Sequence, residues 1–273
     1  MMNPIAEVMT AARTHRATHQ DNTSTAIKLQ EQYRRIRNLT ERLSEPLETE
    51  DYVIQSMPEA SPVKWHLAHT TWFFEAFVLS QLVPSYQPVA SAYGYLFNSY
   101  YNALGPMHCR DRRGLLSRPT VKETFEYRRR VDEQMQSLME SLDEGAGDQL
   151  AALVTLGLNH EQQHQELLLT DIKHAFGQNP LYPAYHPRRP VPDRTVPELS
   201  WESYPEGIFW IGQDGGGFAY DNEGPRHRQF VAPFALASRL VTNEEYLAFI
   251  EDGGYHCPQW WLSLGWQTAT QQR

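Results

Sequence analysis

Apolar positions repeat at the spacing of an amphipathic helix in four segments of the chain, and these segments predict four helices. The segments run from about 24 to 43, 62 to 82, 120 to 142 and 148 to 176. Ser61 and Pro62 open the second segment as a hydroxyl N-cap followed by proline at the first helical position. Pro46 follows the first segment and Gly177 the fourth, as is typical where helices end.

Four helices of these lengths predict a four-helix bundle, because the last two are joined by a very short link at about 145–147. Bundle cores commonly hold metals between facing helices. In the simple up-down-up-down arrangement the second and fourth helices run in the same direction. Modest shifts of the ends of those two helices could then bring histidines on them to one level of the bundle.

The connection between the second and third helices, about 83–119, is unusually long and rich in aromatic residues. Connections of this length in compact domains usually have a function or are disordered, and the aromatic content argues against disorder. Two interpretations stay open: the aromatic side chains pack over one end of the bundle, or they line a pocket. They are Tyr93, Tyr95, Phe97, Tyr100 and Tyr101.

Beyond about residue 180 the composition changes to a proline-rich linker and then to a strand-like, glycine-rich pattern. Strands are expected at 207–212 and 229–234. One short helix follows, opened by Thr242 and Glu245 as a capping box and closed at Gly253. The expected fold class is therefore α+β. The expected segments are a flexible N-terminus (1–23), the bundle (24–178), the linker (179–199) and a second domain (200–273).

The composition is that of a soluble globular protein, since 41% of the 273 residues are hydrophobic and 21% are charged. A net charge of −9 argues against a nucleic-acid partner, although arginines cluster at 110, 112, 113 and 118. Two cysteines, Cys109 and Cys257, are too few for a disulfide framework and indicate a reducing compartment. The sequence contains no apolar run typical of a signal peptide or a bilayer span. We therefore expect a cytoplasmic protein without a membrane partner.

The fourth predicted helix carries His160 and His164, which are four residues apart and surrounded by leucines. Residues at this spacing project from one face of a helix, so both imidazoles can bind one metal ion. A hydrogen-bonded or solvated pair is the simpler interpretation, but two buried imidazoles need partners and a metal supplies them. A third ligand would come from His66 or His69 on the second helix. These two lie on nearly the same helical face, so periodicity leaves the choice open.

The sequence HEQQH at 160–164 also matches the zinc-metalloprotease signature His-Glu-x-x-His, with Glu161 as the general base. The extended signature requires a glycine and a third histidine downstream, but Leu167 and Thr170 occupy these positions. A glutamate ligand on a later helix stays open. The protease is therefore the second interpretation of this motif.

Four motifs in the N-terminal part resemble the ergothioneine-biosynthesis sulfoxide synthases, also called hercynine oxygenases. They are WHLAHT at 65–70, LFNSYY at 96–101, RGLLSRP at 113–119 and NHEQQH at 159–164. The segment 207–266 is similar to the start of a formylglycine-generating-enzyme-like domain. Its motifs are DNE at 221–223, VTNEEY at 241–246 and WLSLGW at 261–266. The resemblance covers nearly everything after about residue 25, and the order of the two domains makes it specific.

The resemblance implies a DinB-like four-helix bundle followed by a domain with the C-type-lectin-like fold. It implies a non-haem Fe(II) centre with His69, His160 and His164 as ligands. The family joins the sulfur of cysteine or γ-glutamylcysteine to the imidazole C2 of hercynine and oxidises the sulfur to a sulfoxide, with dioxygen as the oxidant. By the same resemblance, Arg110 and Arg113 bind the carboxylate of the thiol substrate.

In the family the second domain continues well beyond residue 273, and that part supplies a tyrosine that assists the oxygen chemistry. The chain is therefore expected to be truncated within its C-terminal domain. Three functions stay open: the iron-dependent oxygenase, a zinc-dependent DinB-like hydrolase or thiol transferase with Glu161 as a possible base, and a metal-binding remnant without turnover. The identity of the thiol and the oligomeric state stay open as well.

Overall fold

The computed structural model describes residues 21–99, 105–141, 147–190 and 195–271. The chain divides into two compact units, an N-terminal unit that reaches Arg189 and a C-terminal unit formed mostly by residues from Pro190 onward. The predicted fold class, α+β, is confirmed, with helices in both units and strands in the second. The flexible N-terminus predicted for 1–23 lies almost entirely outside the described residues.

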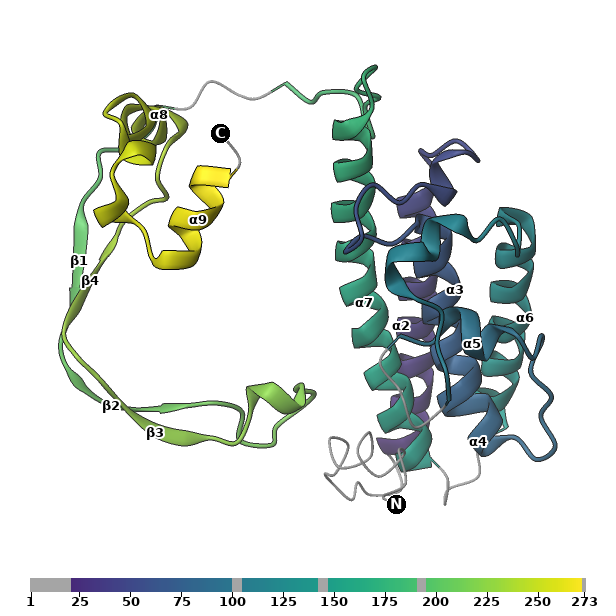
Figure 1. The fold of residues 1–273 in the computed structure, drawn as a ribbon. Helices are drawn as coiled ribbons and strands as arrows, with labels where there is room; N and C mark the ends of the chain where they lie inside the picture. Colours follow the sequence, from purple (N-terminus) through teal and green to yellow (C-terminus); the bar gives the residue numbers. More distant parts are fainter. Residues whose placement is uncertain (1–20, 100–104, 142–146, 191–194, 272–273) are drawn as a thin grey trace. The chain divides into compact units, whose positions relative to one another are not determined.

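Four long helices form the N-terminal bundle (Figure 1), as the sequence predicts. They are α2 (Asp21–Ser44), α3 (Val63–Phe74), α6 (Val121–Glu140) and α7 (Gly147–Gln178). A π-helical turn, η2 (Glu75–Leu79), continues α3 into α4 (Ser80–Leu82), so the predicted second helix does reach Leu82. Shorter helical segments lie in the connections: η1 (Asp51–Val53), α5 (Tyr93–Phe97) and η4 (Arg110–Leu115).

Helix α7 packs against both α2 and α3. The contacts between α3 and α7 show that these helices are antiparallel. His66 lies beside His164, and three residues later His69 lies beside His160, so residue numbers rise along α3 as they fall along α7. The expectation that the second and fourth helices run the same way is therefore wrong.

Contacts of α2 with α7 and α6 give the directions of the other helices in the bundle. Arg37 and Thr40 of α2 bond to Glu161 and Gln165 of α7 in rising order, so α2 and α7 run the same way. The contacts of Gln30 with Met139 and of Glu41 with Arg128 make α2 and α6 antiparallel. Helices α3 and α6 therefore share one direction. The long connection 83–119 makes this possible, because it carries the chain back along the bundle before α6 begins.

The start of α3 differs from its prediction. Pro62, and not Ser61, is the N-cap, and among the described residues no side chain caps this first turn. The Ser61 hydroxyl accepts a hydrogen bond from Nη1 of Arg113 at 2.9 Å, while the Ser61 backbone N–H donates to Asp171 at 2.8 Å. The Ser61 hydroxyl, which the sequence pattern assigned to the helix cap, therefore bonds to a distant side chain instead.

Gly157 allows α7 to lie close to α3, just before the turn that carries His160. A Cβ atom at this position would lie 2.6 Å from a ring carbon of Phe74 and 2.8 Å from one of Phe73. Both rings are buried in the core, so they have little room to move aside. The helix contact that brings the histidines together therefore depends on a residue without a side chain.

We expect Gly157→Ala to destabilise the bundle by about 1–3 kcal/mol, because the added methyl group overpacks the contact between α3 and α7. Gly177→Ala is the matched control, since it lies on the same helix and its Cβ would meet nothing within 4 Å. Helix propensity alone makes the control neutral or slightly stabilising. Thermal unfolding followed by circular dichroism measures both. Equal unfolding midpoints would contradict the proposed role of Gly157.

The described part of the 83–119 connection packs its aromatic segment on α3. The Phe97 side chain is buried, and the indole Nε1 of Trp65 donates to the Leu96 carbonyl at 3.0 Å. The Phe97 carbonyl faces the ring of His69. This segment therefore places a backbone acceptor beside the candidate ligands. Tyr100 and Tyr101 lie outside the described residues.

The C-terminal unit contains two antiparallel strand pairs (Figure 1). β1 (Trp201–Tyr204) pairs with β4 (Phe234–Ala237), and β2 (Gly207–Ile211) pairs with β3 (His227–Val231). The strand predicted at 207–212 is confirmed. The strand predicted at 229–234 is divided, because Pro233 has no N–H group for a ladder and separates β3 from β4.

Two helices follow the strands, α8 (Asn243–Glu251) and α9 (Ser263–Gln271), whereas the sequence pattern indicated one. The predicted capping box of Thr242 and Glu245 is confirmed at the start of α8. Gly253 follows α8 with a φ of 80°, a conformation that favours glycine. The described residues of the predicted linker form turns and extended chain. Within the described parts of the chain, no helix is long and apolar enough to cross a membrane.

Candidate metal centre

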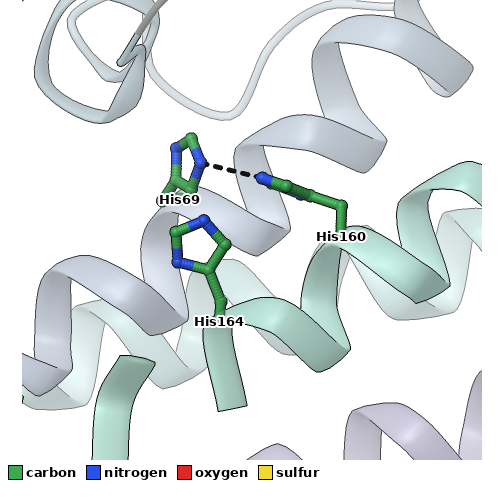
Figure 2. Close-up of side chains that lie close together, drawn as sticks. All are labelled: His69, His160 and His164. Atoms are coloured by element: carbon green, nitrogen blue, oxygen red, sulfur yellow. Dashed lines mark hydrogen bonds between the residues drawn. The ribbon is translucent and has the colours of Figure 1, made fainter. Parts of the chain in front are cut away.

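Three histidines from two helices come together in the bundle. His69 lies on α3, and His160 and His164 lie one turn apart on α7 (Figure 2). Each offers one ring nitrogen, and these atoms all lie within 4.8 Å of one another. The Nε2 atoms of His69 and His160 are 3.1 Å apart. The structure thus gathers the three residues that the resemblance indicates as ligands.

The spacing and charge of these rings fit a metal ion. Two imidazole nitrogens bound at about 2.1 Å and at right angles lie about 3.0 Å apart, close to the observed separation of His69 and His160. Burial lowers the pKa of His160 to about 4. Burial, with further lowering by neighbouring imidazoles, takes the pKa of His69 and His164 well below the usual value. All three are therefore neutral at physiological pH, the form in which histidine binds a metal.

The ring of His69 is held from two sides. Its Nδ1 donates to the Phe97 carbonyl, and its face stacks on Trp65 with ring centroids 4.4 Å apart and planes 13° apart. A carbonyl oxygen only accepts, so Nδ1 carries the proton of the neutral ring. Nε2 is left with a lone pair, and this is the atom that faces His160.

His66 lies beside the cluster, and both of its ring nitrogens have partners. Nδ1 is 2.9 Å from Nδ1 of His164, and Nε2 is 3.0 Å from a carboxylate oxygen of Asp171. Among the described residues, the nitrogens close enough together to share one metal ion belong to His69, His160 and His164, and not to His66. Periodicity left the choice between His66 and His69 open. The geometry now favours His69 as the third ligand, as the resemblance does, and the ligand assignment is a proposal.

Glu161 does not face the cluster, so its interpretation as a general base is wrong. Its side chain is fully buried between helices, where it accepts hydrogen bonds from Arg37 at 2.9 Å and from Arg128 and Thr40, each at 2.6 Å. Burial alone would raise its pKa, but the two guanidinium groups outweigh burial and lower the pKa to about 2. One residue after His160 on a helix points about 100° away, which explains the separation.

The two arginines indicated for the thiol substrate lie in different surroundings. Arg113 is buried, and its guanidinium carbon lies 3.4 Å from the ring centre of Trp65, the indole that stacks on His69. Arg110 is exposed and donates to the Glu59 carbonyl. The structure therefore places Arg113 against the indole that stacks on His69 and leaves Arg110 at the surface of the same short helix, η4.

Known families match both parts of the chain. A sequence model of the DinB superfamily matches residues 32–168, half of the 273-residue chain, and this range contains the whole histidine cluster. The chain belongs to the DinB superfamily. A model of the sulfatase-modifying factor enzyme 1-like domain matches residues 193–273, after the DinB match in the sequence.

Curated relatives of this DinB-superfamily chain carry the name hercynine oxygenase. That of Mycolicibacterium thermoresistibile is 31% identical over 133 residues, 48% of this chain and 29% of the relative. That of Mycolicibacterium smegmatis is 32% identical over 132 residues, 47% of this chain and 30% of the relative. A shorter match, 47% identical over 47 residues, links the chain to the protein of Mycobacterium tuberculosis and covers 17% of this chain and 11% of that one. The resemblance to hercynine oxygenases is confirmed, and each match spans less than a third of the relative's length.

Three charged residues that form hydrogen bonds across this DinB bundle were not predicted from the sequence. Asp171 lies seven residues after His164, two turns further along the same face of α7, and this spacing was a usable signal. Arg37 and Arg128 gave no comparable signal, because their shared partner lies on a third helix. Local spacing identifies neighbours on one helix but not those across the bundle.

Proposed function

We propose that the chain carries the metal centre of a non-haem Fe(II)-dependent oxygenase that joins the sulfur of cysteine or γ-glutamylcysteine to hercynine and yields a sulfoxide. The observation that carries this proposal is the cluster of three neutral imidazoles within 4.8 Å. The relatives named hercynine oxygenase support the assignment of the reaction. The two matched families, in the order DinB and then sulfatase-modifying factor, support it further.

The donor set is suited to this chemistry. Fe(II) held by three neutral imidazoles keeps its full dipositive charge and open coordination positions, which suit an anionic thiolate together with dioxygen. His69, His160 and His164 would hold the ion. His69 is buried, and His160 and His164 are partly buried, so the chain's contribution is to orient the rings and limit the access of water to them.

Arg113 and Arg110 are proposed to bind the carboxylate groups of the thiol substrate. Arg113 is the better placed, because its guanidinium lies against Trp65, whose indole stacks on His69. A planar guanidinium forms paired hydrogen bonds with a carboxylate. Arg110, three residues earlier on η4 and exposed, would meet a second carboxylate further from the metal, which γ-glutamylcysteine has in its glutamyl part.

The test begins with anaerobic reconstitution of the chain with Fe(II). Binding of Fe(II), followed by oxygen consumption and a sulfoxide product that appear only with both hercynine and a thiol, would support the proposal. Lack of Fe(II) binding would contradict the proposal, because the proposed reaction requires the metal centre. A stoichiometric zinc ion with turnover that persists without oxygen would favour the alternative, a zinc-dependent hydrolase or thiol transferase. Glu161 cannot be the general base in that alternative, since both of its carboxylate oxygens accept hydrogen bonds from buried side chains.

We expect Arg113→Gln to weaken the binding of cysteine to the metal-loaded chain by roughly tenfold or more, because hydrogen bonds to charged groups contribute about 1.5–3 kcal/mol. Arg112→Gln is the matched control, since Arg112 is its exposed neighbour on η4. Calorimetric titration of the Co(II)-loaded chain with cysteine measures the affinity. Equal thiol affinity in the two variants would exclude Arg113 as the carboxylate ligand.

A further inference from the structure

Asp171, His66 and His164 form a hydrogen-bonded run that leads from the start of α3 to the histidine cluster. Asp171 Oδ2 lies 3.0 Å from Nε2 of His66, and Nδ1 of His66 lies 2.9 Å from Nδ1 of His164. His66 is buried, and Asp171 is nearly so. The run has no role yet in the proposed function, although it ends on one of the three candidate ligands.

The chemistry of the groups sets the direction of each hydrogen bond. An ionised carboxylate only accepts, so Nε2 of His66 must donate to Asp171. His66 is buried and faces a second imidazole at Nδ1, surroundings that favour the neutral ring, which carries a single proton. Nδ1 of His66 is therefore an acceptor, and Nδ1 of His164 must donate to it. The remaining nitrogen of His164, Nε2, is left with its lone pair.

We propose that Asp171 and His66 are positioning residues that hold His164 as its Nδ1–H tautomer, with the Nε2 lone pair available to the metal. This inference rests on the proposed metal centre. His69 is held in the same state by a different acceptor, the Phe97 carbonyl. Two of the three candidate ligands thus have their Nδ1 proton bound by the protein, which leaves Nε2 as the donor in both.

Asp171 is itself fixed, so the run has a rigid end. The same oxygen that meets His66 accepts the backbone N–H of Ser61 at 2.8 Å, and the Ser61 hydroxyl accepts from Arg113 at 2.9 Å. The carboxylate therefore joins α7 to the residue that precedes α3. A hydrogen bond from a fixed carboxylate through one imidazole to another restricts the ring rotation of both.

The first experiment compares Co(II) and Fe(II) affinities of variants. His66→Leu removes the acceptor for His164 and is expected to weaken metal binding by about 10- to 100-fold, the usual cost of losing a residue that orients a ligand. His66→Gln restores most of the affinity, because an amide oxygen can accept from His164 while its NH₂ group donates to Asp171. His174→Leu is the control, a histidine on α7, the helix of His164, whose ring is bonded to Ser56 at 2.7 Å. It should bind the metal as tightly as the unmodified chain.

The second experiment reads the tautomer directly and needs no metal. Long-range proton–nitrogen correlation spectra of the metal-free, ¹⁵N-histidine-labelled chain distinguish a protonated ring nitrogen from one with a lone pair. We expect His164 protonated at Nδ1 and His66 protonated at Nε2. His66→Leu should change the His164 signals, whereas His174→Leu should not.

The outcomes separate this inference from the proposed function. If the unmodified chain binds neither Co(II) nor Fe(II), the metal centre fails, and the spectra still decide the tautomer. If the chain binds metal but His66→Leu binds it equally well, or if His164 is protonated at Nε2, the positioning role is overturned. Should His66→Leu not fold, the spectra of the unmodified chain together with the His66→Gln affinity decide the matter.

Discussion

Alanine at His69, His160 or His164 is expected to nearly abolish Fe(II) binding by the chain. Each change removes one of the three nitrogens that lie within 4.8 Å of one another. The loss should exceed the about 10- to 100-fold that is typical when only an orienting residue is removed. Anaerobic Fe(II) titration against a coloured chelator measures these affinities.

The other histidines near α7 provide the comparison for these variants. His174→Ala should bind Fe(II) normally, since this ring bonds to Ser56 and lies outside the cluster. His66→Ala should fall between the control and the three ligand variants. Metal binding that survives His69→Ala but is lost in His66→Ala would show that the third ligand is His66.

Glu161→Ala is expected to produce the largest loss of stability of any single substitution considered for this chain, about 3–5 kcal/mol. The carboxylate is fully buried and pairs with Arg37 and Arg128, whose side chains are at most 2% exposed. Its removal leaves two guanidinium groups inside the bundle with one carboxylate fewer to balance them. Urea unfolding measures the change in the free energy of unfolding.

Glu126→Ala on α6 is the matched control for this prediction. Glu126 also pairs with two arginines, Arg129 and Arg130, but all three side chains are largely exposed. Water and salt screen such pairs, so their removal changes stability little. A similar loss in both variants would mean that the buried network contributes no more than a surface ion pair.

Much of the bundle was predictable because the evidence for it is local. The apolar spacing predicts α2, α3, α6 and α7 within a few residues of their observed ends. A residue's neighbours along a helix follow from the repeat of 3.6 residues per turn, so the placement of His160 and His164 on one face needed no structure. The capping box at Thr242 was predictable for the same reason.

Predictions about contacts between different elements were less successful. The predicted relative direction of α3 and α7 was wrong, because a connection as long as 83–119 permits either direction and the sequence pattern does not choose between them. The hydroxyl of Ser61 was assigned to a helix cap and instead bonds to Arg113, fifty-two residues away. Pro233 divided a predicted strand, although its missing N–H group was a signal available in the sequence.

The sequence by itself therefore determined the helices, the shared face of His160 and His164, and the two-domain family resemblance. Only the tertiary structure decided that His69 meets this pair while His66 bonds to Asp171. It also decided that Glu161 turns toward Arg37 and Arg128, and that Arg113 lies against the indole of Trp65. The physical reason is that periodicity specifies which residues share a face of one helix. Which partner meets that face depends on the directions of the helices and on their close packing, and the spacing of residues along one helix determines neither.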